Sequence, residues 1–433
     1  MSRADDILNI ATKRGFFFPS GEIYGAKAGF WTYGHLGTIM KHKFENMWRN
    51  FFLGLSDDYF EIEDTSIMSE DVFKSSGHLK HFHDPMEDEK GGTKNFNLMF
   101  DIRAGVKGDE IMYLRPETAQ GPYVAFKREF MALRERLPIG LAVVGKAFRN
   151  EINPRQGFFR LREFTQAELQ IFFDGKDIDV NFNEVKDYKL IINGKEIKCS
   201  AVKEPKFYIY HLAKIQQFYL GVLGIPKDKF RFREITGNEK AFYNKIHYDI
   251  ELKIESLDGF VEVGGLHYRT DYDTKNHNIL INYNEKKIYP HVLELSFGVD
   301  RNIWGVMDIF FKEEKERNLF LFNRNLSPVE VAIFPLVNKE KIPEKASEIY
   351  NLLKKDFNCF YDSKGSIGKM YRRMDEIGCN AMVTVDYDSL KNNDVTLRDR
   401  NSMRQIRVKI EDLKDTICKF LDGVELGKLG SVI

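Results

Sequence analysis

Charged and aromatic residues are concentrated in residues 148–168, which read FRNEINPRQGFFRLREFTQAE. A turn that contains Pro154 and Gly157 separates two runs and predicts a β-hairpin. Side chains two residues apart on a strand share a face, so Arg149 and Glu151 would point together. The same rule predicts one face for Arg160, Arg162, Phe164 and Glu168. Considered alone, this stripe of cations, carboxylates and a ring is more typical of a solvated hairpin face than of a binding site.

Two further segments place carboxylates near the ends of predicted elements. The segment YLRPETAQGPYVAFKREF predicts a proline turn followed by an amphipathic helix, with Glu117 at the junction. Capping of that helix would explain Glu117 equally well. The segment GFVEVGGLHYRTDYD places Glu262 on a strand that is expected to end at Gly264 and Gly265. A bulge or a tight turn explains this glycine pair better than phosphate binding does.

The segment PHVLELSFGVDRNIWGVMDIFF predicts a strand that leads directly into a helix. Glu294, Ser296 and Gly298 would share one face of the strand, and Arg301 would lie in the first helical turn. An arginine at the start of a helix is well placed to meet a phosphate, although an ion pair with Asp300 is the alternative.

The composition describes the framework that must hold these residues. A chain of 433 residues is long enough for two or three domains. Its 43% hydrophobic and 30% charged residues are typical of a globular protein. Lys plus Arg and Asp plus Glu each number 65, so any polyanion must be met by local patches. The net charge of the chain therefore neither favours nor excludes binding to nucleic acid or to a membrane.

Cysteine usage and the N-terminal segment indicate a cytoplasmic protein. The four cysteines, Cys199, Cys359, Cys379 and Cys418, lie far apart and favour neither a zinc site nor a disulfide framework. Ser2 can cap a helix that ends at Gly15 and whose apolar face is formed by Ile7, Leu8, Ile10 and Ala11. No signal peptide is visible, and no run approaches the ~18 apolar residues of a membrane span.

The pattern of elements changes after about residue 325. Residues 1–325 predict an α+β domain with antiparallel strands and an insertion at about 175–245. Residues 326–433 alternate strands and helices and predict a separate α/β domain. There we expect a helix begun by Pro343 with an apolar face of Ala346, Ile349, Leu352, Leu353 and Phe357. We also expect a hairpin around KNND and a last helix from about residue 410.

Over nearly its whole length the chain resembles glycyl-tRNA synthetase of the homodimeric type, a class II aminoacyl-tRNA synthetase. The resemblance depends on the segments FPSGEIYGAKAGFWTYGHLG, SGHLKHFHDPM, FNLMF, YLRPETAQG, FRNEINPRQGFFRLREFTQAE, RTDYD, LELSFGVDR, VAIFPLV, GSIGKMYRRMDEIG and VTLRDRNSM. Class II motifs 1, 2 and 3 resemble residues 31–53, 148–168 and 291–307. The resemblance implies a catalytic domain on an antiparallel sheet (1–325), an anticodon-binding domain (326–433) and a homodimer packed partly through motif 1.

The resemblance also implies a nucleotide site. Arg149 would contact the α-phosphate of ATP and Arg301 would reach toward the γ-phosphate, which makes these two arginines the expected catalytic residues. Glu151 would lie near the adenine amino group, and Phe164 would stack beneath the base. The full ATP set implied is Arg149, Asn150, Glu151, Phe159, Arg160, Leu161, Arg162, Glu163, Phe164, Glu262, Val263, Gly298, Val299, Asp300 and Arg301. Mg²⁺ would enter with ATP, and no zinc or other protein-only metal site is expected.

A second set implied by the resemblance would hold glycine: Glu117, Phe164, Thr165, Gln166, Ala167, Glu168, Glu294, Leu295, Ser296, Phe297 and Gly298. The expected reaction joins glycine and ATP into glycyl-adenylate and pyrophosphate, and then moves glycine to its tRNA. The attacking carboxylate is already anionic, so this chemistry needs positioning and positive charge rather than a nucleophile or base from the protein. Arginines and Mg²⁺ supply that charge.

Some residues depart from the family pattern. His35 and Leu295 replace prolines that the family often carries, and DPMEDEKGG leads almost directly to FNLMF where many relatives have a Cys-rich insertion. A metal site formed by His78, His81, His83 and Asp84 is an alternative that the absence of cysteine partners disfavours. For tRNA, the second domain offers Lys369, Arg372, Arg373, Arg398, Arg400, Arg404 and Arg407, although such charge runs are usually solvated surface.

Two other functions are open to the same sequence. A catalytically silent relative, such as the synthetase-like accessory subunits of DNA polymerases, would have lost the phosphate-binding arginines, whereas Arg149 and Arg301 are present. A synthetase for serine, proline, threonine or histidine would not require RPETAQG and so many acidic pocket residues. Both alternatives are therefore weaker than a glycine-specific enzyme.

Overall fold

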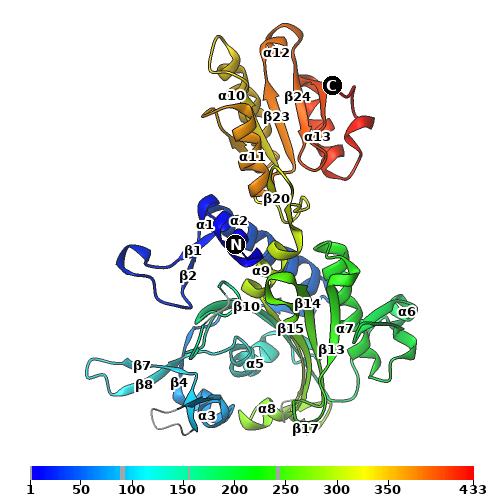
Figure 1. The fold of residues 1–433 in the computed structure, drawn as a ribbon. Coiled ribbons are helices and arrows are strands. Elements are labelled where there is room, and N and C mark those ends of the chain that lie inside the picture. The colour runs from blue at the N-terminus through cyan, green and yellow to red at the C-terminus, as the bar shows by residue number, and fades with distance from the viewer. Residues whose placement is uncertain (1, 88–92, 155–156, 240–243) are drawn as a thin grey trace. The chain divides into compact units, whose positions relative to one another are not determined.

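A computed structural model describes residues 2–87, 93–154, 157–239 and 244–433 (Figure 1). The chain divides into two compact units. One consists of Met1–Phe18, Tyr33–Lys43 and Phe310–Ile433, and the other of Pro19–Thr32 and Phe44–Ile309. The sequence-based boundary at residue 325 stays a prediction.

The larger unit is built on a nine-stranded sheet with the order β12-β11-β13-β14-β15-β18-β10-β9-β3. In that order the strands are Lys195–Lys198, Lys189–Ile192, Phe230–Glu234, Ile246–Ile254, Gly259–Thr270, His291–Gly298, Glu163–Phe173, Ile139–Phe148 and Tyr59–Glu61. Its pairs are antiparallel except β3 with β9 and β11 with β13. The expected α+β class is confirmed, and residues 175–245 add β11, β12 and β13 to one edge of this sheet.

The two faces of the central strands differ in polarity because side chains alternate along a strand. On β10, Ala167, Leu169 and Ile171 are fully buried on one face. On the same side of β18, the ring of Phe297 contacts Trp48 and Phe52 of α2 (His35–Phe52), with ring centroids 5.9 and 4.8 Å apart. This face is an aromatic core.

The opposite face carries a polar region beside a smaller apolar cluster. Helix α5 (Gln120–Ala132) lies against this face (Figure 1). There Phe126 stacks on Phe172 of β10, with ring centroids 4.3 Å apart. Beyond Phe172 the same face of β10 presents Gln170, Glu168 and Gln166, all of them buried. Buried polar side chains need partners, so this region must be a hydrogen-bonded network or a site.

The other elements of the larger unit lie around the sheet. They are β4 (Ile67–Ser69), α3 (Glu70–Ser75), α4 (His78–His81), β5 (His83–Glu87), β6 (Thr93–Asn97), β7 (Phe100–Ala104), β8 (Glu110–Leu114), α6 (Phe182–Val185), α7 (Lys206–Gln217), α8 (Tyr272–Asn276), β16 (Ile281–Tyr283), β17 (Lys286–Ile288) and α9 (Val299–Phe310). The short strands β1 (Phe17–Pro19) and β2 (Trp31–Tyr33) precede α2.

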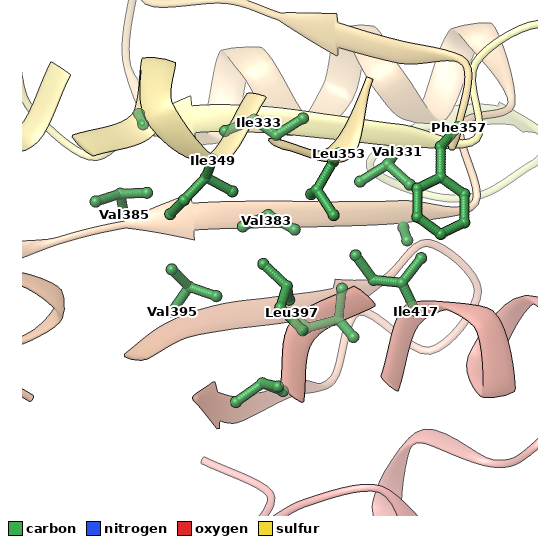
Figure 2. Packing of buried hydrophobic residues seen from close by; sticks show 14 of the residues in the cluster. Val331, Ile333, Ile349, Leu353, Phe357, Val383, Val385, Val395, Leu397 and Ile417 are labelled. Carbon is green, nitrogen blue, oxygen red and sulfur yellow. The ribbon is translucent and has the colours of Figure 1, made fainter. Parts of the chain in front are cut away.

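The smaller unit contains a five-stranded sheet with the order β22-β21-β23-β24-β25. These strands are Cys359–Tyr361, Val331–Pro335, Ala381–Val385, Asp394–Asp399 and Gln405–Lys409, and its helices include α10 (Ile342–Leu353), α11 (Ile367–Ile377), α12 (Tyr387–Asn392) and α13 (Leu413–Leu421). Figure 2 shows the core between the sheet and helices α10 and α13, where residues such as Ile333, Ile349, Leu397 and Ile417 meet. The expected α/β alternation is confirmed.

Further elements of the smaller unit are α1 (Arg3–Arg14), β19 (Phe311–Glu313) and β20 (Asn318–Phe320). Helix α1 begins as predicted, with a capping box between Ser2 and Asp5, and ends at Gly15 in the left-handed conformation. No helix within the described residues is both long enough and apolar enough to cross a membrane.

Three expectations for the smaller unit were wrong. Leu352 is 44% exposed and lies outside the core. The buried face of α10 is formed by Ile342, Ala346, Ile349 and Leu353, which follow the helical period, and Leu352 is not on that face. The KNND residues end helix α12 at Asn393 and form no hairpin; the hairpin lies between β24 and β25. Arg398 and Arg400 are not solvated surface, because each is only 4% exposed.

The buried arginines have structural partners. Arg398 donates through Nη1 to Asp375 at 3.1 Å, and Arg400 donates through Nη1 to the carbonyl oxygens of Phe322 and Gly378 at 2.9 and 2.8 Å. Arg407 is paired with Asp386. Among the cations that the sequence offered for tRNA, Lys369, Arg372 and Arg404 are exposed.

Candidate active site

A cavity of about 240 Å³ opens on the polar face of the central sheet in the larger unit. Seventeen of the residues that the sequence predicted line it: Glu117, Arg149, Glu151, Phe159, Arg160, Leu161, Phe164, Thr165, Gln166, Glu168, Glu262, Val263, Glu294, Ser296, Gly298, Asp300 and Arg301. Gly264, His267 and Arg269 line it as well. The two predicted substrate sets therefore meet in one cavity.

Seven other predicted residues do not line the cavity: Asn150, Arg162, Glu163, Ala167, Leu295, Phe297 and Val299. Ala167, Leu295, Phe297 and Val299 are buried apolar residues. The first three lie at the positions of β10 and β18 whose side chains face the aromatic core. Arg162 donates through Nη2 to the carbonyl oxygen of Glu151 at 2.9 Å, and Glu163 lies 3.3 Å from the Lys146 ammonium. Direct contacts of these residues with a substrate stay predictions.

The predicted hairpin is shorter than the sequence suggested. β9 ends at Phe148 and β10 begins at Glu163, so Arg149, Glu151 and Arg160 lie in the connection rather than on strands. The backbone bends there, because the Glu151 N–H donates to the carbonyl oxygen of Arg149 at 2.7 Å. Within this connection Arg160 donates through Nε to Glu151 at 2.8 Å. Arg155 and Gln156, at the predicted turn, lie outside the described residues.

The carboxylate of Glu168 lies at the centre of the acidic end of the cavity. It accepts hydrogen bonds from Ser296 at 2.7 Å, Thr118 at 2.8 Å and the Gln166 amide at 2.9 Å. Pairing of β10 with β18 brings Glu168 directly opposite Ser296. Burial, together with the nearby charges of Glu294 and Glu117, raises the pKa of Glu168 to about 8.

Glu294 is held at the same end of the cavity by a buried arginine. Arg269 donates to Glu294 at 3.3 Å and makes a two-point contact with Asp273 at 2.7 and 2.9 Å. Burial raises the pKa of Glu294, although Arg269 opposes that shift. His267 lies across the strands from Glu294, and burial with the adjacent His247 and Arg269 holds its pKa well below the usual value. This shift favours the neutral form of the His267 imidazole.

Glu117 differs from the other two acids. It does not cap α5, whose N-cap is Ala119, because its carboxylate faces the cavity and accepts from the Gln120 amide at 2.9 Å. Burial alone would raise its pKa, but His78, with Nε2 at 3.5 Å, and Arg269 outweigh burial and hold that pKa far below the usual range. The acidic end of the cavity thus combines one carboxyl whose pKa is lowered, Glu117, with two whose pKa is raised, Glu168 and Glu294.

The basic end of the cavity is formed by Arg149 and Arg301. The guanidinium of Arg149 lies over the rings of Phe82 and Phe164, 5.3 and 5.2 Å from their centroids. Arg301, in the first turn of α9 as predicted, lies 5.2 Å from the ring of Phe159. Cations stacked on aromatic rings are oriented without being fully neutralised, so both remain able to meet an anion.

The strand that carries Glu262 does not end at the glycine pair, contrary to the expectation. β15 continues to Thr270, and its register with β14 shifts next to Ile250, which indicates the predicted bulge. A side chain at Gly264 would overlap the carbonyl oxygen of Ser296, so only glycine allows the two strands to approach there. Glu262 lies at the cavity with Arg301 3.5 Å from its carboxylate.

Sequence reasoning missed the roles of Arg269, His267, Thr118 and His78. Arg269 and Asp273 belong to the RTDYD segment, and an Arg–Asp pair four residues apart was the available signal. No group of three or more His, Cys, Asp or Glu side chains in the described part of the chain could hold a metal ion. His78 instead faces Glu117. Residues 88–92, in the segment considered for the Cys-rich insertion, lie outside the described residues.

Comparisons with known proteins agree with this geometry. Residues 104–310 match the tRNA synthetase class II core domain (G, H, P, S and T), and residues 330–419 match the anticodon binding domain. The crystal structure of prolyl-tRNA synthetase from Cryptosporidium parvum complexed with L-proline and AMP has a TM-score of 0.72 at 15% identity, covering 98% of this chain and 76% of that chain. That likeness shows the fold.

Relatives at higher identity share one name. The glycine–tRNA ligase of Borrelia hermsii is 35% identical over 95% of this chain and 96% of its own length. The glycine–tRNA ligases of Pyrococcus horikoshii and Methanothermobacter thermautotrophicus are 34% and 33% identical, over 96% and 95% of this chain and 98% of each relative. The last alignment extends over 556 positions, so that relative carries segments that this 433-residue chain lacks. The chain belongs to the glycine–tRNA ligase family of class II tRNA synthetases.

Proposed function

We propose that this protein joins glycine to tRNA in two steps, first forming glycyl-adenylate and pyrophosphate from glycine and ATP and then transferring the glycyl group to the 3′ end of tRNA, with AMP as the leaving group. The observation that supports this best is the polarity of the cavity. The partly buried Glu117 and the buried Glu168 and Glu294 line one end, and the aromatic-stacked Arg149 and Arg301 line the other. An amino acid with an ammonium and a carboxylate, joined to a triphosphate, has the complementary order of charges.

In the first step a carboxylate oxygen of glycine bonds to the α-phosphorus of ATP. The bond from that phosphorus to the bridging oxygen breaks, and pyrophosphate leaves. No residue must act as a base, because the attacking group is already ionised. Arg149 would neutralise charge that develops on the α-phosphoryl oxygens, and Arg301 would hold the leaving phosphates. Removing one such donor typically raises the barrier by about 3 kcal/mol.

At the acidic end the carboxylates would hold the glycine ammonium. Each hydrogen bond between charged groups contributes roughly 1.5–3 kcal/mol. Glu117 is ionised before the substrate arrives, whereas Glu168 must lose its proton to contribute fully. Selection of glycine requires only that no room is left for a side chain, because no smaller amino acid competes.

Magnesium would be bound together with ATP rather than by a protein-only site. Mg²⁺ commonly takes one or two protein carboxylates and completes its shell with phosphates and water. Glu262, at the cavity beside Arg301, is the carboxylate that fits this role. When bound, the ion would neutralise phosphate charge. The homodimer, the cytoplasmic location and the anticodon as ligand of the smaller unit also belong to this proposal.

Exchange of pyrophosphate into ATP, measured with each amino acid in turn, tests the first step. We expect exchange with glycine and none with alanine, serine, proline, threonine or histidine. Exchange driven by another amino acid would reassign the substrate, and no exchange with any would favour a catalytically silent relative. Aminoacylation of a glycine tRNA transcript, with a proline tRNA as control, then tests the second step.

A further inference from the structure

A short segment outside the cavity contacts both of its ends. Residues 76–84 comprise the single helical turn of α4 and the start of β5. His78 and Phe82 are four residues apart, so this turn brings them to the same side, with ring centroids 5.5 Å apart. Neither residue lines the cavity. Any effect of theirs on substrates must therefore pass through the residues that they touch.

His78 is oriented toward Glu117. The Nδ1 atom of His78 lies 2.7 Å from the hydroxyl oxygen of Ser76, and its Nε2 lies 3.5 Å from the Glu117 carboxylate. An Nδ1 that accepts from the serine hydroxyl leaves the proton on Nε2, facing Glu117. The side chains of His78 and Glu117 are only 12% and 17% exposed, so solvent screens this contact weakly.

Phe82 is oriented toward Arg149. Its ring is one of the two that the Arg149 guanidinium contacts. The backbone is held as well, because the Leu98 N–H donates to the carbonyl oxygen of Phe82 at 3.1 Å and the Asn150 N–H donates to that of Leu98 at 2.8 Å. These two hydrogen bonds fix Phe82 relative to the residue that follows Arg149.

The segment reaches a third residue of the cavity and is itself anchored elsewhere. Asp84 lies 3.5 Å from the guanidinium of Arg160, which in turn is bonded to Glu151. Leu79 and Phe82 both pack against the cluster of Met68, Phe73 and Met99, and the ring of Phe73 lies 6.0 Å from that of His78. The segment is thus anchored in a small apolar core, from which His78, Phe82 and Asp84 reach residues that line the cavity.

We propose that residues 76–84 form a positioning element for adenylate formation, in which His78 orients Glu117 toward the glycine ammonium and Phe82 orients Arg149 toward the α-phosphate. The inference rests on the proposed function. It assigns no substrate contact to the segment. It makes His78 and Phe82 positioning residues whose separate losses must appear in different kinetic parameters.

Substitutions at His78 and Phe82 test this division in the full-length protein by pyrophosphate exchange. His78→Ala should raise the KM for glycine about tenfold and leave the KM for ATP unchanged, since one hydrogen bond to a charged group is lost. His78→Gln, which keeps a donor, should recover most of this loss. Phe82→Leu should lower kcat about fivefold with the glycine KM unchanged, and Phe82→Tyr, which keeps the ring, should not.

The pH dependence of the His78 variant supplies a readout that a merely structural role would not change. The groups that face Glu117 are His78 from α4, Arg269 and His267 from β15, Tyr123 and Gln120 from α5, Glu168 from β10 and Glu294 from β18. Without His78 the pKa of Glu117 rises, so Glu117 takes up a proton as pH falls. The glycine KM of His78→Ala should therefore rise more steeply on acidification than that of the unmodified protein.

Leu79→Ala is the matched control, because it loosens the same helical turn without touching Glu117 or Arg149. It should lower Tm and leave both KM values and kcat within about twofold. The inference is overturned if Leu79→Ala reproduces both kinetic signatures, or if His78→Ala and Phe82→Leu change all parameters alike. Absence of glycine-dependent exchange in the unmodified protein would instead reject the proposed function.

Discussion

Glycine binding should release a proton at neutral pH, and Glu168 should be its source. Burial raises the pKa of this carboxyl to about 8 in the ligand-free cavity. At pH 7 it is therefore about nine-tenths protonated. A bound ammonium favours the carboxylate, so its pKa falls on binding and about 0.9 proton per site should leave. Affinity should rise about tenfold between pH 6 and pH 7 and level off above pH 8.

Isothermal titration calorimetry measures this release directly. A non-reactive sulfamoyl analogue of glycyl-adenylate is titrated at pH 7 in buffers of different ionisation enthalpy, and the slope of observed heat against that enthalpy is the number of protons released. Glu168→Gln should reduce the slope to near zero. The matching adenosine sulfamate, which has no ammonium, should release no proton from the unmodified protein.

Two results would refute this reasoning. A zero slope with the unmodified protein would mean that Glu168 is already ionised at pH 7. An unchanged slope in Glu168→Gln would move the proton to another acid, of which Glu294 is the candidate because burial raises its pKa too.

The same pKa shift makes the stability of the folded protein depend on pH. The folded-state pKa of Glu168 lies above the value of an unfolded glutamic acid, so the folded state binds the proton more tightly. Stability is then fully present below the unfolded pKa and is lost as pH rises toward 8. Glu168→Gln should therefore raise Tm relative to the unmodified protein at pH 9 but not at pH 4.

Three further substitutions have distinct expected outcomes. Arg149→Ala should slow pyrophosphate exchange about a hundredfold, as expected for one lost donor to the transition state, while tRNA binding measured by filter retention changes little; equal loss of both would contradict its assignment to the phosphate. Gly264→Ala should lower the free energy of unfolding by about 1–3 kcal/mol in urea titrations, because the new methyl group meets the carbonyl oxygen of Ser296. Asp375→Ala, which leaves two buried guanidinium groups without their shared carboxylate, should cost about 3–5 kcal/mol. The exposed Asp388 is the control, and its alanine variant should change stability by less than about 0.5 kcal/mol.

Local sequence signals were sufficient to predict where an element begins or ends when a single residue marks that point. Ser2 and Gly15 delimit α1, and the strand-to-helix change before Arg301 is where the pattern predicted it. Alternation also predicted correctly that Glu294 and Ser296 share one face of the strand, and both line the cavity. These features depend on neighbours in the chain, which a sequence displays directly.

Long-range pairing could not be predicted from the residues alone. Glu168 lies opposite Ser296 because β10 pairs with β18, and no local pattern specifies this register. The pairing of β15 with β18 likewise brings His267 beside Glu294. Alternation also overestimated the hairpin, because Arg160 and Arg162 follow the strand period without lying on a strand. Charge alone could not reveal that Arg398 and Arg400 are buried, since only the fold supplies their partners.

The pairing of β10, β18 and β15 has a consequence for how substrate choice can change. Glu168, Glu294, Ser296 and His267 stand at positions fixed by the hydrogen bonds between these strands, which are roughly 4.8 Å apart. Exchanging one side chain therefore alters the shape and charge of the site without moving the others, whereas a one-residue slip would turn the whole row toward the aromatic core. Because the strand pairing fixes the backbone, substitution of a single residue on these strands can change which amino acid substrate the site prefers.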